Sequence, residues 1–123
     1  MGRKKLTMIG GGQIGGNLAL IAAQKELGDV VIFDIPQSEG MVKGKALDIM
    51  QLRPHDGYDS ELLGTSDYSD IAGSDIIIIT GAAGSGKSTF ADKFIALQKN
   101  NNKNYGDLPE SIGLGPTTRW IKK

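Results

Sequence analysis

The sequence predicts an α/β fold in which a parallel sheet of about four strands, in the order 3-2-1-4, is flanked by helices. Short apolar runs alternate along the chain with segments of helical periodicity, which is typical of βαβ units. Glycine-rich loops follow two of these apolar runs, at the places where an α/β sheet commonly binds a ligand. Because 123 residues suffice for a modest core, we expect residues 1–123 to form a single domain.

The composition argues against several classes of function. Fourteen basic residues balance fourteen acidic ones, so we expect no nucleic-acid partner. The chain has no cysteine, which excludes disulfides and thiolate metal sites. We find no signal peptide and no apolar window long enough for a membrane span, so we expect a soluble, cytoplasmic protein without a membrane partner.

The first apolar run, Leu6 to Ile9, predicts a strand that leads into the first glycine-rich loop. This loop matches the pattern G-x-G-x-x-G at Gly10, Gly12 and Gly15. In that pattern the glycines allow a tight turn and bring the backbone close to a pyrophosphate at the start of a helix. The helix is predicted by apolar residues at helical spacing, namely Ile14, Leu18, Ile21 and Ala22, and Gly28 is placed to end it.

A second predicted strand, Val30 to Phe33, is followed by an acidic residue, Asp34. Asp34 lies about twenty residues beyond Gly15, where a dinucleotide-binding fold places the carboxylate that binds the adenosine ribose. A carboxylate there accepts hydrogen bonds from the ribose hydroxyls and repels a 2′-phosphate, which favours NAD over NADP. The alternative is a solvated acid at the end of a strand.

With these motifs in place, residues 4–80 resemble the amino-terminal half of the NAD-dependent malate dehydrogenases, in the branch similar to lactate dehydrogenases. The resemblance is carried by KLTMIGGGQIG (5–15), KELGDVVIFDIP (25–36), GKALDIM (44–50), GTSDY (64–68) and SDIIIITGA (74–82). It implies a Rossmann-like half-domain over residues 4–82 that binds NAD. The cofactor contacts that it implies are Gly10, Gly12, Gln13, Ile14, Gly15, Asp34, Ile35, Thr80, Gly81 and Ala82.

The middle of the chain predicts shorter elements. A helix over 44–52, ended by Pro54, lies at a subunit interface by the resemblance, although simple packing on the sheet explains it equally well. His55 is expected in a surface turn. A third strand is predicted over 59–64, and a brief helix over 67–71.

The second glycine-rich loop follows four isoleucines, Ile76 to Ile79, which predict a strand buried on both faces. Residues 81–88 fit G-x-x-x-x-G-K-[ST], the P-loop that cradles phosphates, so ATP is expected here and residues 81–98 form the loop and its helix. The predicted contacts are Gly81, Ala82, Ala83, Gly84, Ser85, Gly86, Lys87, Ser88 and Thr89, with the Ser88 hydroxyl as a possible Mg²⁺ ligand. The alternative is a glycine-rich turn that binds nothing.

The tail, residues 99–123, matches no family in this reading. A short strand is expected over 117–121, and Trp120 either covers the sheet or stacks on a nucleotide base. If the isoleucine strand lies at a free sheet edge, either this segment covers it or two chains associate as a homo-oligomer.

The function expected from these motifs is binding of a small-molecule nucleotide, ATP through the P-loop, NAD through the first loop, or both. No catalytic residue is predicted, because no arginine lies between Arg53 and Arg119 to bind a substrate carboxylate. Intact malate dehydrogenase chemistry is therefore not expected. The alternatives are a P-loop phosphotransferase or ATPase, a truncated malate dehydrogenase, and a chimera or designed chain whose loops bind nothing.

Overall fold

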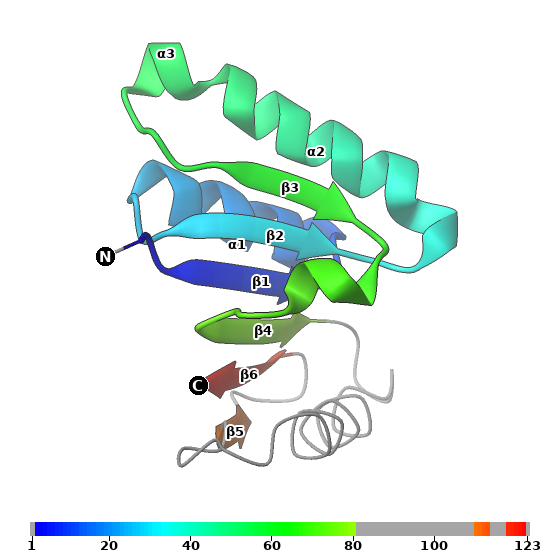
Figure 1. Cartoon of the computed structure of the whole chain (residues 1–123). Helices are drawn as coiled ribbons and strands as arrows, with labels where there is room; N and C mark the ends of the chain where they lie inside the picture. Colours follow the sequence, from blue (N-terminus) through cyan, green and yellow to red (C-terminus); the bar gives the residue numbers. More distant parts are fainter. Residues whose placement is uncertain (1, 81–109, 114–117, 123) are drawn as a thin grey trace.

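The computed structural model describes residues 2–80, 110–113 and 118–122, which build a six-stranded sheet in the order β3-β2-β1-β4-β6-β5 (Figure 1). The strands β1 (Lys5–Ile9), β2 (Asp29–Phe33), β3 (Leu62–Thr65) and β4 (Ile76–Thr80) run parallel. The strand β6 (Thr118–Lys122) pairs antiparallel with β4, and β5 (Glu110–Gly113) pairs antiparallel with β6. The parallel sheet predicted in the order 3-2-1-4 is thus confirmed, and two further strands extend it.

The two long helices, α1 (Gln13–Gln24) and α2 (Glu39–Gln51), pack against the same face of the sheet. Alternate residues of the strands point to this face, and they join the helices in one core that includes Leu6, Met8, Val30, Ile32, Ala19, Ala23 and Val42. The opposite face forms a smaller cluster around Ile71, which lies in the 3-10 helix η2 (Tyr68–Ile71). The brief helix predicted over 67–71 is this element.

The helix α1 uses only part of the apolar face that its periodicity predicts. Of the predicted residues, Ala22 is buried and Leu18 packs against the core, but Ile14 and Ile21 are 45% and 46% exposed. The buried residues of the helix are Gly15, Ala19, Ala22 and Ala23. Small side chains on the buried face let the helix axis approach the sheet closely, and the two isoleucines are left outside.

The predicted end of α1 at Gly28 is also wrong. The left-handed residue is Glu26, with φ 51°, and the N–H groups of Glu26 and Leu27 donate to the carbonyls of Ala23 and Ala22. This is the pattern of a Schellman cap. Gly28 serves a different purpose, because a Cβ there would lie 2.3 Å from the carbonyl oxygen of Lys4, the residue before β1.

The second helix begins earlier than predicted, at Glu39, and Pro54 does not end the helical region. Pro54 instead lies in the first turn of the short helix α3 (Arg53–Asp56), where its missing N–H costs nothing. His55, predicted in a surface turn, therefore lies in this short helix. Figure 1 shows α2 running alongside β3, and a Cβ on Gly64 of β3 would lie 2.2 Å from the carbonyl oxygen of Val42 on α2.

The isoleucine strand β4 lies inside the sheet, between β1 and β6. Ile77 and Ile79 are buried, while Ile76 and Ile78 are half-buried, so burial on both faces is only partly realised. The strand predicted over 117–121 is confirmed as β6 and covers the β4 edge. That edge is therefore not free for association of two chains, as the alternative required.

In the part of the chain that the structure describes, no helix is long and apolar enough to cross a membrane.

Removal of residues 105–123 is expected to increase self-association, because it leaves the backbone N–H and C=O groups along β4 without the partners that β6 supplies. Sedimentation velocity of the full and shortened chains, over a range of concentrations, measures this. An unchanged sedimentation profile would mean that the β4 edge is protected by other means.

Candidate dinucleotide-binding site

The candidate site lies where β1, β2 and β4 end at the same edge of the sheet (Figure 1). The chain turns at Gly10, whose N–H donates to the carbonyl of Phe33 at the end of β2 (2.8 Å). From β4, the Thr80 hydroxyl lies 3.2 Å and 3.1 Å from the carbonyl oxygens of Ile9 and Gly10, to which it donates. The first glycine-rich loop is thus hydrogen-bonded to both neighbouring strands.

Two fingerprint glycines are required by close packing. Gly10 has φ +99°, and a Cβ there would lie 2.8 Å from the backbone carbonyl oxygen of Thr80. A Cβ on Gly15 would lie 1.7 Å from the carbonyl oxygen of Gly10, because the first turn of α1 sits directly on the loop. These two glycines therefore form the turn and seat the helix on it.

Gly12 differs from the other two, because a Cβ there would meet nothing within 4 Å. Gly12 precedes α1, has no side-chain cap, and is exposed together with Gln13 and Ile14. Among the described residues, the N–H groups of Gly12 and Gln13 have no hydrogen-bond acceptor. The first turn of α1 also carries no acidic residue, so no carboxylate of that turn offsets the positive end of the helix dipole. This arrangement suits a bound anion.

Asp34 is half-buried at the end of β2, and both of its carboxylate oxygens accept backbone hydrogen bonds. One oxygen accepts from the N–H of Gly11 (2.8 Å) and the other from the N–H of Ile35 (2.7 Å). These bonds fix the carboxylate beside the glycine-rich loop, and each oxygen keeps a further lone pair for a ligand hydroxyl. Ile35 is 56% exposed beside it.

Two other acids belong to the connections that follow β2 and β3. The pKa of Glu39 is lowered by the hydrogen bond and charge of Lys43, which lies 2.6 Å away. The pKa of Asp67 is lowered by the backbone N–H of Ser69, which donates to its carboxylate. Both side chains are therefore ionised at neutral pH. The charge of Glu39 is balanced by Lys43, whereas Asp67 has no ion pair among the described residues and adds negative charge just after β3.

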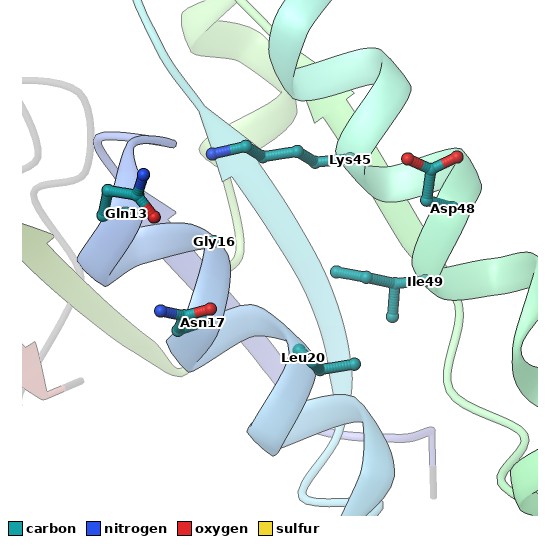
Figure 2. Close-up of a pocket in the computed structure, with 7 residues that line it drawn as sticks. All are labelled: Gln13, Gly16, Asn17, Leu20, Lys45, Asp48 and Ile49. Atoms are coloured by element: carbon teal, nitrogen blue, oxygen red, sulfur yellow. The ribbon is translucent and has the colours of Figure 1, made fainter.

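The residue that the sequence analysis missed is Lys45, on α2. Its ammonium donates to the carbonyl oxygens of Gly11 (2.6 Å) and Gly12 (3.0 Å). Figure 2 shows Lys45 reaching from α2 toward the start of α1, above a cavity of about 200 Å³ between the two helices. That cavity is lined by Gln13, Gly16, Asn17, Leu20, Lys45, Asp48 and Ile49. The only signal in the sequence was the position of Lys45 within the GKALDIM segment.

The second glycine-rich loop cannot be compared with its prediction, because Gly81 to Thr89 lie outside the described residues. This includes Lys87 and the possible magnesium ligand Ser88. Over the described residues, no group of three or more His, Cys, Asp or Glu side chains is arranged to hold a metal ion.

Comparison with known proteins decides the family. Residues 4–89 match the family model of the lactate/malate dehydrogenase NAD-binding domain. The chain belongs to the lactate/malate dehydrogenase family. It is a Rossmann domain of that family, and the match includes the whole of the segment 81–89.

The relatives agree with this assignment. The chain is 68% identical over 79 residues to the malate dehydrogenase of Myxococcus xanthus. The aligned residues make up 64% of this chain and 25% of that protein. It is 62% identical over 80 residues to the malate dehydrogenase of Trichlorobacter lovleyi, and these residues make up 65% of this chain and 24% of that protein. The chain thus spans about a quarter of the length of these curated relatives.

Solved structures show the same fold. The lactate dehydrogenase of Cryptosporidium parvum, complexed with lactic acid and nicotinamide adenine dinucleotide, has a TM-score of 0.64 and 39% identity. That likeness covers 86% of this chain and 35% of the other. The malate dehydrogenase of the same organism has a TM-score of 0.61 and 36% identity, covering 85% and 35%.

Substitution by alanine should destabilise the domain at Gly15 but have little effect at Gly12. Gly15→Ala forces a methyl group into the Gly10 carbonyl and is expected to lower the free energy of unfolding by at least about 1–3 kcal/mol. Gly12→Ala should change it by less than about 0.5 kcal/mol, because its methyl group enters open space. Urea unfolding of the two variants and the parent measures both. Equal losses would contradict the packing described for this loop.

Proposed function

We propose that this domain binds NAD, with the pyrophosphate at the loop between β1 and α1 and the adenosine ribose on Asp34. The observation that carries the proposal is the uncapped start of α1, where the N–H groups of Gly12 and Gln13 have no acceptor among the described residues. A dinucleotide pyrophosphate is an anion that needs backbone N–H donors and close approach to the backbone, and both are available there.

The charges near the ribose position favour NAD over NADP. Asp34 offers two acceptor oxygens to the ribose hydroxyls, and Glu39 and Asp67 belong to the connections that follow β2 and β3. A 2′-phosphate would bring additional negative charge toward Asp34, with no positive side chain paired to that carboxylate among the described residues.

We propose cofactor binding without hydride transfer to a 2-keto acid by these residues alone. A substrate carboxylate calls for an arginine side chain at the carboxyl edge of the sheet, and proton transfer calls for a group such as histidine. Arg119 lies on β6 opposite Ile79, near that edge. Arg3 pairs with Asp29 and Asp59, and Arg53 pairs with Glu61, all before the parallel strands begin or at their first residue. His55 lies on α3, which Figure 1 shows near the start of β3, away from the carboxyl ends of the parallel strands.

A second candidate function is ATP binding by the segment Gly81 to Ser88. The observation that favours it is the complete G-x-x-x-x-G-K-[ST] pattern directly after β4, with Lys87 and Ser88 in the positions that contact phosphate and Mg²⁺. A phosphotransferase or ATPase activity, and a chimeric origin of this part of the chain, stay predictions.

Asp34→Asn tests the first candidate through cofactor preference. Loss of the charge and of one acceptor oxygen should weaken NADH binding by roughly tenfold or more, as expected for a hydrogen bond to a charged group. Binding of NADPH should weaken less, so the preference for NADH falls. Fluorescence titration with both cofactors measures this.

Asp59→Asn is the matched control, because Asp59 makes its ion pair with Arg3 away from the glycine-rich loop and should leave both affinities unchanged. A parent chain that binds neither cofactor would refute the proposal, and an unaltered preference in Asp34→Asn would refute the role of Asp34.

Lys87→Ala tests the second candidate. It should weaken Mg-ATP binding by roughly 1.5–3 kcal/mol, the contribution of a hydrogen bond between charged groups, and leave NADH binding nearly unchanged. Because β1 and β4 are neighbours and their loops open at one edge, Mg-ATP should also displace NADH. Calorimetric titration measures both effects. A parent chain that ignores ATP would refute this candidate, and equal losses for both nucleotides would show that the two loops are not separate sites.

A further inference from the structure

We propose that Lys45 is a positioning residue for dinucleotide binding, which orients two peptide groups of the glycine-rich loop so that their N–H groups face the phosphates. This inference rests on the proposed NAD function and adds a residue on α2 to a site otherwise built from β1, α1 and the end of β2. Lys45 itself lies behind the loop and touches only its carbonyl oxygens.

The argument starts from the geometry of the peptide bond. The carbonyl of Gly11 shares a peptide group with the N–H of Gly12, and the carbonyl of Gly12 shares one with the N–H of Gln13. In a planar trans peptide the C=O and N–H bonds point in opposite directions. Because both carbonyls accept from the Lys45 ammonium, both N–H groups are turned away from Lys45. They are the same two N–H groups that have no acceptor among the described residues.

The loop is held from two sides by opposite charges. The N–H of Gly11 donates to the Asp34 carboxylate, while the carbonyl of Gly11 accepts from Lys45. Each bond joins a charged group to a backbone group, and such bonds are stronger than those between neutral groups. The orientation of the loop is therefore set before any ligand arrives, and a ligand does not have to order it.

The neighbouring residues leave room for this contact. A Cβ on Gly16 would lie 3.1 Å from the Lys45 ammonium nitrogen and 3.3 Å from its Cδ, so the side chain crosses α1 at a residue with no side chain (Figure 2). A Cβ on Gly11 would lie 2.2 Å from a methyl carbon of Val42, one turn earlier on α2. Thus α2 packs against the back of the loop at both Val42 and Lys45.

Lys45 forms no ion pair with a carboxylate in the described part of the chain, although Asp48 lines the same cavity and Asp34 binds the N–H of Gly11. Its positive charge therefore adds to that of the helix start, behind the peptide groups that would bind the phosphates.

Lys45→Met in the full chain tests this, with Lys43→Met as the matched control. Both substitutions remove one ammonium from α2 and keep an unbranched stem, but Lys43 pairs with Glu39 and does not contact the loop. We expect Lys45→Met to weaken NADH binding roughly tenfold, and Lys43→Met to change it less than twofold. Adenosine, which lacks phosphates, should bind both variants as it binds the parent. Lys45→Arg keeps a cationic donor and should restore most of the NADH affinity.

A second measurement needs no nucleotide. In ¹⁵N-labelled protein the amide resonances of Gly12 and Gln13 should shift in Lys45→Met, because their peptide groups lose the ammonium, and should stay in place in Lys43→Met. Unmoved resonances would overturn the proposal even if the parent chain bound no NADH, an outcome that would by itself refute only the proposed function. An equal loss of adenosine and NADH binding would also overturn it, as would failure of Lys45→Arg to recover affinity. If Lys45→Met does not fold, Lys45→Gln replaces it in both measurements.

Discussion

The close seating of α1 on the turn after β1 is the constraint on which the rest of the domain depends. The helix begins so near Gly10 that residue 15 cannot carry a Cβ, and its buried face is made of glycine and alanine for the same reason. Because the first turn of α1 lies so close to this loop, the helix begins at the edge of the sheet where β1, β2 and β4 end. A ligand anion at this edge meets the helix dipole directly, rather than across a layer of side chains.

The amino and carboxyl ends of the parallel strands are chemically different. At the amino ends, Arg3 and Arg53 pair with carboxylates, but these pairs are largely exposed and contribute little to stability. At the carboxyl ends, the side chains of Asp34, Thr80 and Lys45 form hydrogen bonds with the backbone of the first glycine-rich loop and of Ile9 just before it. Among the described residues, the N–H groups of Gly12 and Gln13 are left without an acceptor there, whereas those of Gly10 and Gly11 are bonded to Phe33 and Asp34. The proposed site thus consists of a loop whose carbonyls are satisfied by side chains and whose last two donors are open.

Much of this could be predicted from local patterns. The strand order follows from the alternation of apolar runs and helical segments, and Gly10, Gly15 and Asp34 follow from fixed spacings. The face of α1 could not be predicted from hydrophobicity, because the short approach to the sheet selects Ala19 and Ala23 over Ile14 and Ile21. The end of α1 was missed because glycine is only the commonest left-handed residue, and Glu26 takes that conformation here. Lys45 was missed because its contact joins α2 to a loop that lies 33 and 34 residues earlier in the sequence.

The strand β6 pairs with β4 although it lies outside the residues that match the family model. The two malate dehydrogenases compared above likewise match only about two thirds of the chain. Pairing between strands uses backbone N–H and C=O groups, which every residue except proline supplies in full. A segment unlike the family can therefore still complete the ladder beside β4, provided that it is extended and in register. The proposed binding of NAD is more demanding, because it depends on particular residues, namely Gly12, Asp34 and Lys45. These all lie within the part of the chain that matches the family.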